Sequence, residues 1–589
     1  MTYPLDDARK EIISALENAL SQLQIDLIPR SYKKLLRRGE LTKVLESPPE
    51  DLGDFAFPCF FLSPVLKKSS KDIAKDIAKK IEPSKWIEKI ETKGAYVNFF
   101  INITHLKTLT IKSILEKQKK YGCLPNKNKK VVIEHTSANP NGPLHVGRAR
   151  NPIIGDTLVR IFKAAGYDVE SQFYLDDMGK QVAILTWGLN NLDSKKVPKS
   201  EYDKPDHHNV GFYQAANELM EKDEKVSEEI GEIVKRSEHG ESKTIELVHK
   251  SYALVLEGIN ESLERINIQI DKYIPESTFV RNKSVEQVIN KLKKTKYCHE
   301  EDRAFYLDLE PFGIQGRNTK FFFIRKDGTT LYATRDIAYH QWKAKHADLL
   351  INVLGEDHKL ESKQVEIALK LLDTKILPWV LFYAFVSLPS GKMSTRRARG
   401  VYLDELIDEC IERAYKEVEK RRGNELSEDK MKRIAEMVGI GSLRYNIIKV
   451  QPEKDIVFKW EEALNFEGNA VPFIQYAHAR ACSILSKIKD KRREFDSNTL
   501  THDSEVKLIK QLARFPLFIE NASCSYKPHI IANYLYETAS KFNQFYRDCP
   551  VLSEKNIMLG KSRITLVDVA RIVLDNALEL LGISAPEEM

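Results

Sequence analysis

The chain has 589 residues, 42% of them apolar and 30% charged, and its 92 Lys and Arg against 85 Asp and Glu give a net charge of +7. This length exceeds what one hydrophobic core can organise and predicts about four domains, and the mild excess of cations permits a nucleic-acid partner without requiring one. The seven scattered cysteines, with no C-x-x-C pair, argue against a disulfide framework and a zinc knuckle and favour a reducing compartment.

Residues 1–110 are expected to form a small α+β domain. A helical stripe of apolar residues runs through residues 12–20, and residues 55–62 and 96–101 are aromatic and apolar enough for strands. The basic segment 30–38, which also holds Tyr32, is equally compatible with a solvated helix face and with a contact to RNA.

A different pattern follows the Lys-rich connector and predicts a parallel sheet within residues 111–400. Residues 131–133 are a short β-branched run, an apolar helical stripe covers residues 153–165 up to Gly166, and residues 169–175 predict a second strand. Strand, helix and strand at this spacing indicate a parallel βαβ unit. The charged, mostly helical residues 190–300 are interpreted as an insertion between two halves of the sheet.

The second half of the sheet is predicted from a strand at 320–325, a turn at Asp327-Gly328 and a partner strand near 330–333. A central strand at 349–354, a helix at 361–372 and a strand at 380–388 follow. Beyond about residue 400 every long pattern is helical, at 402–422, 429–449, 472–489 and 562–581. We therefore predict a multidomain α/β protein with a Rossmann-like parallel-sheet domain, a helical connector (401–460) and an all-α C-terminal domain (461–589).

Three segments end predicted strands, where open α/β sheets bind their ligands. In 134–150, His145, Arg148 and Arg150 could meet phosphate at a helix N-terminus. In 355–358, acidic and imidazole groups suit ribose hydroxyls and a polar substrate. The loop 390–397 carries cations that could stabilise a triphosphate. A plain turn, an ordinary polar loop and a solvated basic loop remain the simpler alternatives.

Together these segments resemble the class I aminoacyl-tRNA synthetases, in which an H-x-G-H turn and a K-M-S-K-S loop bracket ATP. Here they are His145-Val146-Gly147-Arg148 and Lys392-Met393-Ser394-Thr395-Arg396. Residues 134–145, 174–181, 327–336, 473–480 and 581–587 are similar to segments of one family in that class, the arginyl-tRNA synthetases.

The resemblance implies ATP-dependent attachment of L-arginine to tRNA(Arg) through an arginyl-adenylate, with release of AMP and diphosphate. Mg²⁺ would accompany ATP, and no protein-bound metal is expected. The N-terminal domain would contact the tRNA elbow and the C-terminal domain the anticodon. The resemblance also suggests a monomer. We expect a cytoplasmic location, because the first ten residues lack the apolar core of a secretory signal and the longest apolar run, 379–388, is about half the length of a membrane-spanning helix.

By family position the resemblance assigns four groups of residues. The expected ATP-binding residues are Pro143, His145, Gly147, Arg148, Gly355, Glu356, His358, Lys392, Met393 and Ser394. The expected arginine-binding residues are Glu134, Ser137, Asn139, His145, Gln181, Tyr332, Asp336 and His358. The expected catalytic residues, acting electrostatically on the phosphates, are His145, Arg148, Lys392 and Arg396. The expected tRNA-binding residues are Gln475, Tyr476 and Arg480, with Phe473, Tyr476, Tyr534, Phe542 and Tyr546 as candidates for base stacking.

The spacing of Tyr332 and Asp336 predicts that one helical turn places both on the same side. Two departures from the family pattern stand out: Arg148 occupies a position where histidine is usual, and Thr395 occupies that of the second lysine of the loop.

Two alternatives remain open. One is a class I synthetase for glutamate or cysteine, and the other is a catalytically silent tRNA-binding relative.

Overall fold

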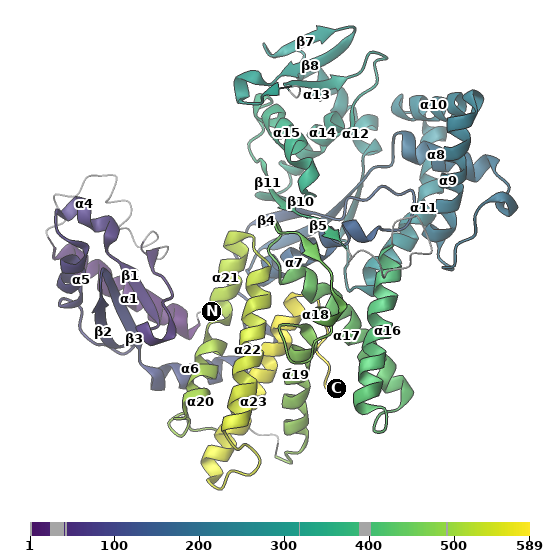
Figure 1. Ribbon diagram of the computed structural model, residues 1–589. Coiled ribbons are helices and arrows are strands. Elements are labelled where there is room, and N and C mark those ends of the chain that lie inside the picture. The colour runs from purple at the N-terminus through teal and green to yellow at the C-terminus, as the bar shows by residue number, and fades with distance from the viewer. Residues whose placement is uncertain (1–2, 24–40, 42–43, 317–318, 388–401, 491–492) are drawn as a thin grey trace.

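A computed structural model describes residues 3–23, 41, 44–316, 319–387, 402–490 and 493–589. Figure 1 shows a small N-terminal domain on one side of a central α/β domain, with a long helical bundle below that domain and a helical layer beside it. Two basic segments lie outside the described residues: 30–38, a candidate RNA contact, and 390–397, the loop expected to stabilise a triphosphate.

The N-terminal domain packs helices on a small antiparallel sheet. Strands β1 (Phe55–Pro58), β3 (Tyr96–Ile101) and β2 (Ile87–Lys93) form the sheet in that order, and α1 (Pro4–Ser21) and α5 (Ser70–Ala78) contribute its core. The expected strand over 55–62 ends at Pro58, and a short 3-10 turn follows. Helix α6 (Ile103–Lys117) spans the expected boundary at residue 110 and leads to the helical bundle, where the Lys107 ammonium donates to the carbonyl of Leu500.

The central sheet has five parallel strands in the order β11-β10-β4-β5-β6. They are β4 (Lys130–Glu134), β5 (Asp168–Leu175), β6 (Lys272–Pro275), β10 (Leu349–Gly355) and β11 (Pro378–Tyr383). Helix α7 (Arg150–Ala164) connects β4 to β5, which confirms the predicted βαβ unit. The prediction of a central strand at 349–354 is also confirmed.

The predicted insertion at 190–300 was too long, because β6 belongs to the main sheet and pairs with β5. The helical layer consists of α8 (Lys180–Asn191), α9 (Pro205–Lys222), α10 (Glu224–Glu238) and α11 (Ser242–Arg265). After β6 come α12 (Ser277–Arg281), α13 (Ser284–Leu292) and an antiparallel sheet of β7 (Cys298–Glu301), β8 (Ala304–Asp308) and β9 (Lys320–Ile324).

The expected strand near 330–333 is wrong. A single bridge joins Ile324 to Thr330, and α14 (Tyr332–Lys343) begins directly afterwards. The reason is that Ala333, Ile337 and Ala338 repeat at helical spacing and are buried, so a helix covers the core better than a second hairpin strand.

The long elements described beyond residue 402 are helices, as predicted. Helix α15 (Lys359–Leu371) lies between β10 and β11, and the predicted last strand is split into β11 and β12 (Val386–Ser387), which pairs with β13 (Ile456–Val457). The later helices are α16 (Leu403–Arg422), α17 (Glu428–Ile448), α18 (Trp460–Ala463), α19 (Val471–Ser486), α20 (Asp503–Ala513), α21 (Phe515–Ser525), α22 (His529–Asp548) and α23 (Ile557–Leu580).

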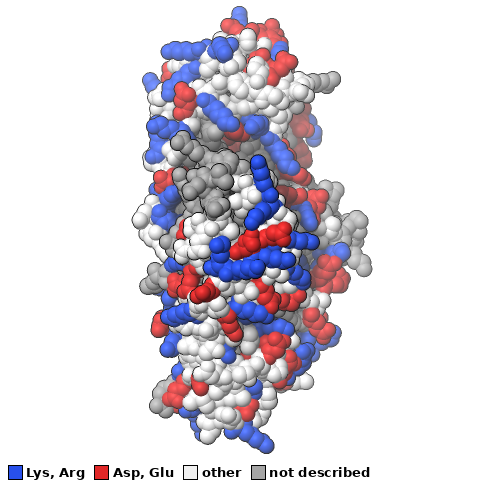
Figure 2. Space-filling view, turned by 90° about the vertical axis from the view of Figure 1, so that its left-hand side faces the viewer, with Lys and Arg blue, Asp and Glu red and all other residues white. Residues whose placement is uncertain are grey.

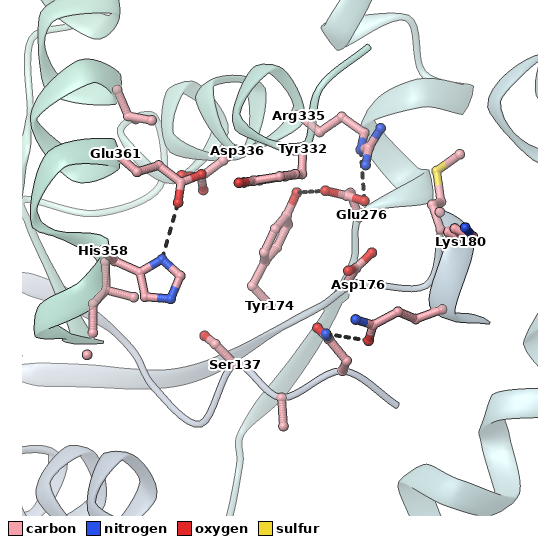
Figure 3. Close-up of a pocket in the computed structure, with 18 of the residues that line it drawn as sticks. Ser137, Tyr174, Asp176, Lys180, Glu276, Tyr332, Arg335, Asp336, His358 and Glu361 are labelled. Atoms are coloured by element: carbon pink, nitrogen blue, oxygen red, sulfur yellow. Dashed lines mark hydrogen bonds and ion pairs between the residues drawn. The ribbon is translucent and has the colours of Figure 1, made fainter. Parts of the chain in front are cut away.

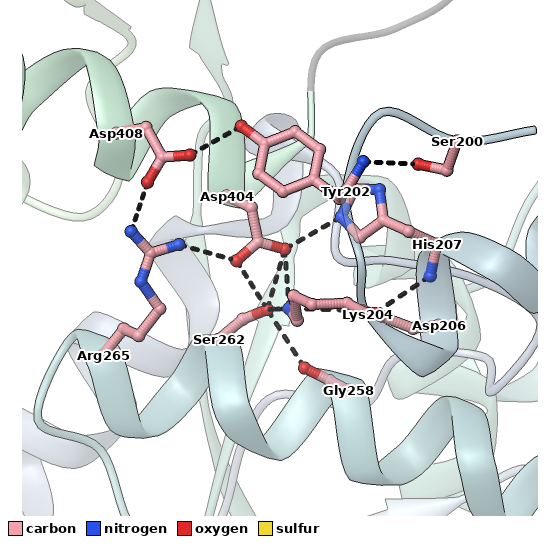
Figure 4. A network of polar contacts seen from close by, with 10 residues as sticks. All are labelled: Ser200, Tyr202, Lys204, Asp206, His207, Gly258, Ser262, Arg265, Asp404 and Asp408. Carbon is pink, nitrogen blue, oxygen red and sulfur yellow. Dashed lines mark hydrogen bonds and ion pairs between the residues drawn. The ribbon is translucent and has the colours of Figure 1, made fainter.

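A buried polar network joins the helical layer to α16 (Figure 4). The Asp404 carboxylate, in the first turn of α16, accepts hydrogen bonds from Lys204 (2.8 Å) and His207 (3.0 Å). It also accepts from Ser262 and Arg265 of α11. These contacts fix where α16 begins relative to α9 and α11.

Three ligand-type atoms of this network, from Asp206, His207 and Asp404, lie within 4.8 Å of one another. The Lys204 ammonium lies 2.8 Å from Asp404 and 3.7 Å from Asp206, so the network is already neutralised by a cation of the chain. We therefore interpret it as a structural junction and not as a metal site.

The surface carries both signs of charge. On the face shown in Figure 2, Lys and Arg are interspersed with Asp and Glu. Within the described part of the chain, no helix combines the length and the apolar character needed to cross a membrane.

Candidate functional site

A large pocket opens at the carboxyl ends of the central strands, with a cavity volume of about 1080 Å³ (Figure 3). It lies between the ends of β4, β5 and β10, the first turns of α14, and α10 of the helical layer. Of the residues predicted from the sequence, those that line it are Glu134, Ser137, Asn139, Arg148, Gln181, Tyr332, Asp336, Gly355 and His358. The structure therefore gathers most of the predicted arginine-binding residues in one cavity.

Tyr332 and Asp336 line the pocket from the first two turns of α14, as their spacing predicts. Tyr332 is 57% exposed, so its ring is available to a ligand. Asp336 accepts a hydrogen bond from His340 Nδ1 at 3.0 Å. Burial works against ionisation of Asp336, but His340 and Lys343 outweigh it and hold its pKa below the usual range. The carboxyl group is thus prepared to meet a cation.

Glu134 is buried at the end of β4, and one of its carboxylate oxygens already accepts from the Lys343 ammonium. Its other oxygen has only a long contact of 3.4 Å with the Ser137 hydroxyl. The turn after β4 is strained, because Thr136 (φ 78°) and Ser137 (φ 28°) adopt left-handed conformations that residues with side chains avoid. Such strain directly after a strand is typical of functional turns.

Three side-chain amides lie together at one wall of the pocket. The Asn139 side-chain amide donates to the Gln181 carbonyl oxygen at 2.7 Å, and Asn141 donates to the same oxygen at 3.0 Å. These residues come from the turn after β4 and from the start of α8. The Gln181 amide nitrogen and the Asn139 carbonyl oxygen offer a donor and an acceptor to the backbone groups of an amino acid.

An ion-paired group that sequence reasoning missed forms a third wall. Arg335 Nε lies 2.8 Å from Glu276, and its guanidinium also pairs with Glu238 of α10 at 3.6 Å. Tyr174 donates to Glu276 at 3.2 Å, and Asp176 lies beside them (Figure 3). Burial raises the pKa of Glu276 to about 8, although Arg335 opposes the shift. The sequence around Glu276 does not predict its place in the pocket, because only the fold brings the end of β6 close to α14.

The His145 turn lies at the start of the helix that follows β4. His145 Nδ1 accepts from the Gly147 amide at 3.2 Å, and His145 pairs with Tyr402 through a β-bridge. Burial and the neighbouring Arg148 lower the pKa of His145. His145, Gly147 and the buried Pro143 are not among the residues that line the pocket, whereas Arg148 is, and it donates to the Ser137 carbonyl at 3.4 Å.

Arg150 does not face the ligand side, contrary to the prediction. Its side chain is fully buried and donates to the carbonyls of Ala384, Gln451 and Lys454 at 2.6–2.8 Å. Both terminal nitrogens of the guanidinium are thus used to join α7 to the segments after β11 and before β13.

At the end of β10, Gly355 and His358 line the pocket together with Asp357. A hydrogen bond with Glu361 raises the pKa of His358. Glu356 is absent from the lining and pairs with Lys359 at 3.1 Å instead. Four predicted ATP-binding or catalytic residues, Lys392, Met393, Ser394 and Arg396, lie outside the described residues.

The predicted tRNA contacts on α19 fall into two classes. Gln475 is fully buried and donates to the carbonyls of Met437 and Ser584, so its place as a tRNA contact was wrong. Tyr476 is 41% exposed, and the Arg480 guanidinium lies over its ring at 4.7 Å.

The base-stacking candidates divide in the same way. Tyr534 and Phe542 belong to the core of the bundle and are not available for stacking, while Phe473 packs against Tyr536. Tyr546 is 39% exposed, and Arg480 also lies over its ring, at 5.1 Å. Arginine between two exposed aromatics is an arrangement suited to unpaired bases.

Family models cover most of the chain. Residues 110–460 match a model described as tRNA synthetases class I (R), catalytic domain. Residues 10–101 match a model for the arginyl tRNA synthetase N-terminal domain, and residues 474–589 match the DALR anticodon binding domain.

Curated relatives and solved structures agree with these models. The arginine–tRNA ligase of Methanocella arvoryzae is 48% identical over 90% of this chain and 92% of its own length. That of Methanothermobacter thermautotrophicus is 42% identical over 98% and 99%. The structure of Thermus thermophilus arginyl-tRNA synthetase matches with a TM-score of 0.81 at 26% identity, covering 99% of this chain and 100% of that one.

Proposed function

The chain belongs to the arginyl-tRNA synthetase family, and we propose that the pocket at the carboxyl ends of β4 and β10 is where it activates arginine. Its reaction is the ATP-dependent attachment of L-arginine to tRNA(Arg) through an arginyl-adenylate, with release of AMP and diphosphate. The observation that carries the placement is the convergence of Glu134, Tyr332 and Asp336 on one cavity.

The arginine guanidinium has five donors in a fixed plane and needs carboxylates and other acceptors around it. Asp336, the free edge of Glu134 and the Tyr332 hydroxyl supply them. Asn139 and Gln181, with Ser137, orient the α-amino and α-carboxyl groups of the substrate. Lysine would leave several of these acceptors unpaired, and such a loss discriminates strongly between substrates.

ATP would lie beside this site, along the turn Pro143–Arg148 and the end of β10. The guanidinium of Arg148 and the imidazoles of His145 and His358 suit phosphate oxygens and ribose hydroxyls, and Gly147 and Gly355 allow close approach. Glu356 is the weakest member of the predicted set, because its carboxylate is engaged by Lys359. Lys392, Met393, Ser394 and Arg396 would complete the set, and Mg²⁺ would enter with ATP, bound by its phosphates.

In the first step the carboxylate of arginine attacks the α-phosphate, and diphosphate leaves. His145, Arg148, Lys392 and Arg396 stabilise the negative charge that develops on the phosphates. In the second step a ribose hydroxyl of the terminal adenosine of tRNA attacks the activated carbonyl, and AMP leaves. No covalent bond to the enzyme is required in either step.

We propose that tRNA spans the molecule from the N-terminal domain, at its elbow, to the all-α domain, at its anticodon. Tyr476, Arg480 and Tyr546 form the exposed platform for unpaired anticodon bases. Bound tRNA is expected to be required for the first step. A cytoplasmic monomer is the working state that we propose for the enzyme.

The test is exchange of labelled diphosphate into ATP by the purified chain. We expect exchange to depend on arginine and on tRNA(Arg) together. Exchange stimulated by glutamate or cysteine would favour another class I synthetase, and tRNA binding without any exchange would favour a silent relative.

A further inference from the structure

A buried cation lies beneath the arginine pocket without lining it. Lys343, in the last turn of α14, has a side chain that is 0% exposed. Its ammonium donates to Glu134 and to the Asn352 side-chain oxygen (3.0 Å), and it lies 4.1 Å from the centre of the Tyr339 ring. Glu134, His340 and Asn352 line the pocket and contact Lys343, so Lys343 acts on a ligand through these neighbours.

The same cation determines how His340 is protonated. Because an ammonium group has no acceptor, Asn352 must point its oxygen at Lys343 and its amide NH₂ at His340 Nε2, 2.8 Å away. His340 Nε2 is therefore the acceptor, and the proton of the neutral ring lies on Nδ1. That proton is shared between two oxygens of Asp336, the backbone carbonyl at 2.8 Å from Nδ1 and the carboxylate at 3.0 Å.

Two carboxylates of the pocket are thus held from behind by one unit. Lys343 holds Glu134 directly, and through Asn352 and His340 it sets the donor that holds Asp336. Two carboxylates and one ammonium leave one negative charge, which a single guanidinium neutralises. A buried ion pair is weak evidence for a role in stability alone, because apolar residues of similar volume can often replace it.

We propose that Lys343 and Asn352 are positioning residues that set the specificity of the pocket for a singly charged guanidinium. They hold the Glu134 and Asp336 carboxylates in place in the wall of the cavity. The proposal rests on the proposed placement of arginine between these two carboxylates. It concerns arginine recognition only and predicts no direct effect on ATP, whose proposed site lies along the His145 turn.

The experiment compares Lys343→Met, Asn352→Asp and the control Lys345→Met in tRNA-dependent diphosphate exchange, with rates normalised to active sites by adenylate titration. Lys345 follows α14 and is exposed, so its variant should match the parent. For Lys343→Met we expect the arginine KM to rise by about tenfold or more while the ATP KM stays within about twofold, as expected for loss of a buried charge partner.

Asn352→Asp tests the second arm. The new carboxylate can still pair with Lys343, but it cannot donate to His340 Nε2. Between two carboxylates the imidazole of this variant takes up a second proton, and the resulting imidazolium forms an ion pair with Asp336 that competes with the guanidinium of the substrate. The expected result is again a raised arginine KM with an unchanged ATP KM, and this variant keeps the proposal testable if Lys343→Met does not fold.

Citrulline is a neutral isostere of arginine. The preference of the enzyme for arginine over citrulline would not change if Lys343 served stability alone. Loss of Lys343 removes the donor that holds the Glu134 carboxylate in place, so the preference for arginine over citrulline as a competitor should narrow by about tenfold. Equal rises in the arginine and ATP KM values, or an unchanged arginine KM, would overturn the proposal. Absence of arginine-dependent exchange in the parent enzyme would instead overturn the proposed function.

Discussion

Removal of the Asp404 charge should weaken the junction between the helical layer and α16. The Asp404 side chain is 1% exposed and accepts from Lys204, His207, Ser262 and Arg265. Asp404→Asn removes the buried carboxylate that Lys204 and Arg265 share and leaves them only Asp206 and Asp408, and breaking a buried pair costs about 3–5 kcal/mol. For a domain of roughly this size, each kcal/mol corresponds to about 2–4 °C, so the first thermal transition should fall by about 6–20 °C.

The pH dependence has a definite sign. Burial would raise the pKa of Asp404, but hydrogen bonds from His207 and Lys204 hold it well below its usual range. The stabilisation is therefore complete above the unfolded-state pKa and is lost only as the pH falls through the depressed folded-state value. At neutral pH the parent enzyme should show the full difference from Asp404→Asn.

The assay is thermal unfolding followed by circular dichroism, with limited proteolysis of residues 205–265 as a local probe. Asp408→Asn is the matched control. The Asp408 side chain is 46% exposed and pairs with Arg265, so its loss should change stability by no more than about 1 kcal/mol. If Asp404→Asn and Asp408→Asn shifted the transition equally, the buried network would not be what holds α16 in place.

Three further predictions concern the site. In diphosphate exchange, Asp336→Ala should raise the arginine KM about 30-fold or more and leave the ATP KM nearly unchanged. The rise corresponds to about 2 kcal/mol or more for a lost charge partner. Unchanged arginine kinetics would reject the assignment of Asp336 to the guanidinium. Arg148→Ala should lower kcat for exchange by about 100-fold, as for loss of a group that stabilises transition-state charge, while Arg148→His keeps activity; an active Arg148→Ala would remove Arg148 from the chemistry. Tyr476→Ala should raise the tRNA KM in aminoacylation about 5-fold or more, because one base stack is lost. Gln475→Ala should instead lower thermal stability without a specific change in the tRNA KM. A raised tRNA KM for Gln475→Ala at unchanged stability would contradict the burial of Gln475.

The sheet was predictable because 131–133 and 349–354 are mostly apolar and 169–175 ends in the apolar run Phe173-Tyr174-Leu175. Residues 131–133, 169–175 and 349–354 are each bounded by turn residues, and burial on both faces demands this composition. The strand β6 escaped notice because Lys272–Pro275 is short and polar at one end. The helical start at Tyr332 was missed because the preceding Asp327-Gly328 turn is also a hairpin signal.

The site was predictable where family position and local spacing coincide, as at Tyr332 and Asp336. It was not predictable where the role of a residue depends on distant partners. Arg150 has the same local setting as Arg148, yet three carbonyls from remote segments enclose it. Lys343 reads as a surface lysine of an amphipathic helix, and only the fold shows it under Glu134.

The central claim is that this chain recognises arginine and transfers it to tRNA. The most direct measurement is aminoacylation of tRNA by the purified chain with ATP and Mg²⁺, carried out separately with each labelled amino acid. The account predicts acid-precipitable charging with arginine and with no other amino acid, including lysine. Charging with a different amino acid, or with none while tRNA still binds, would contradict it.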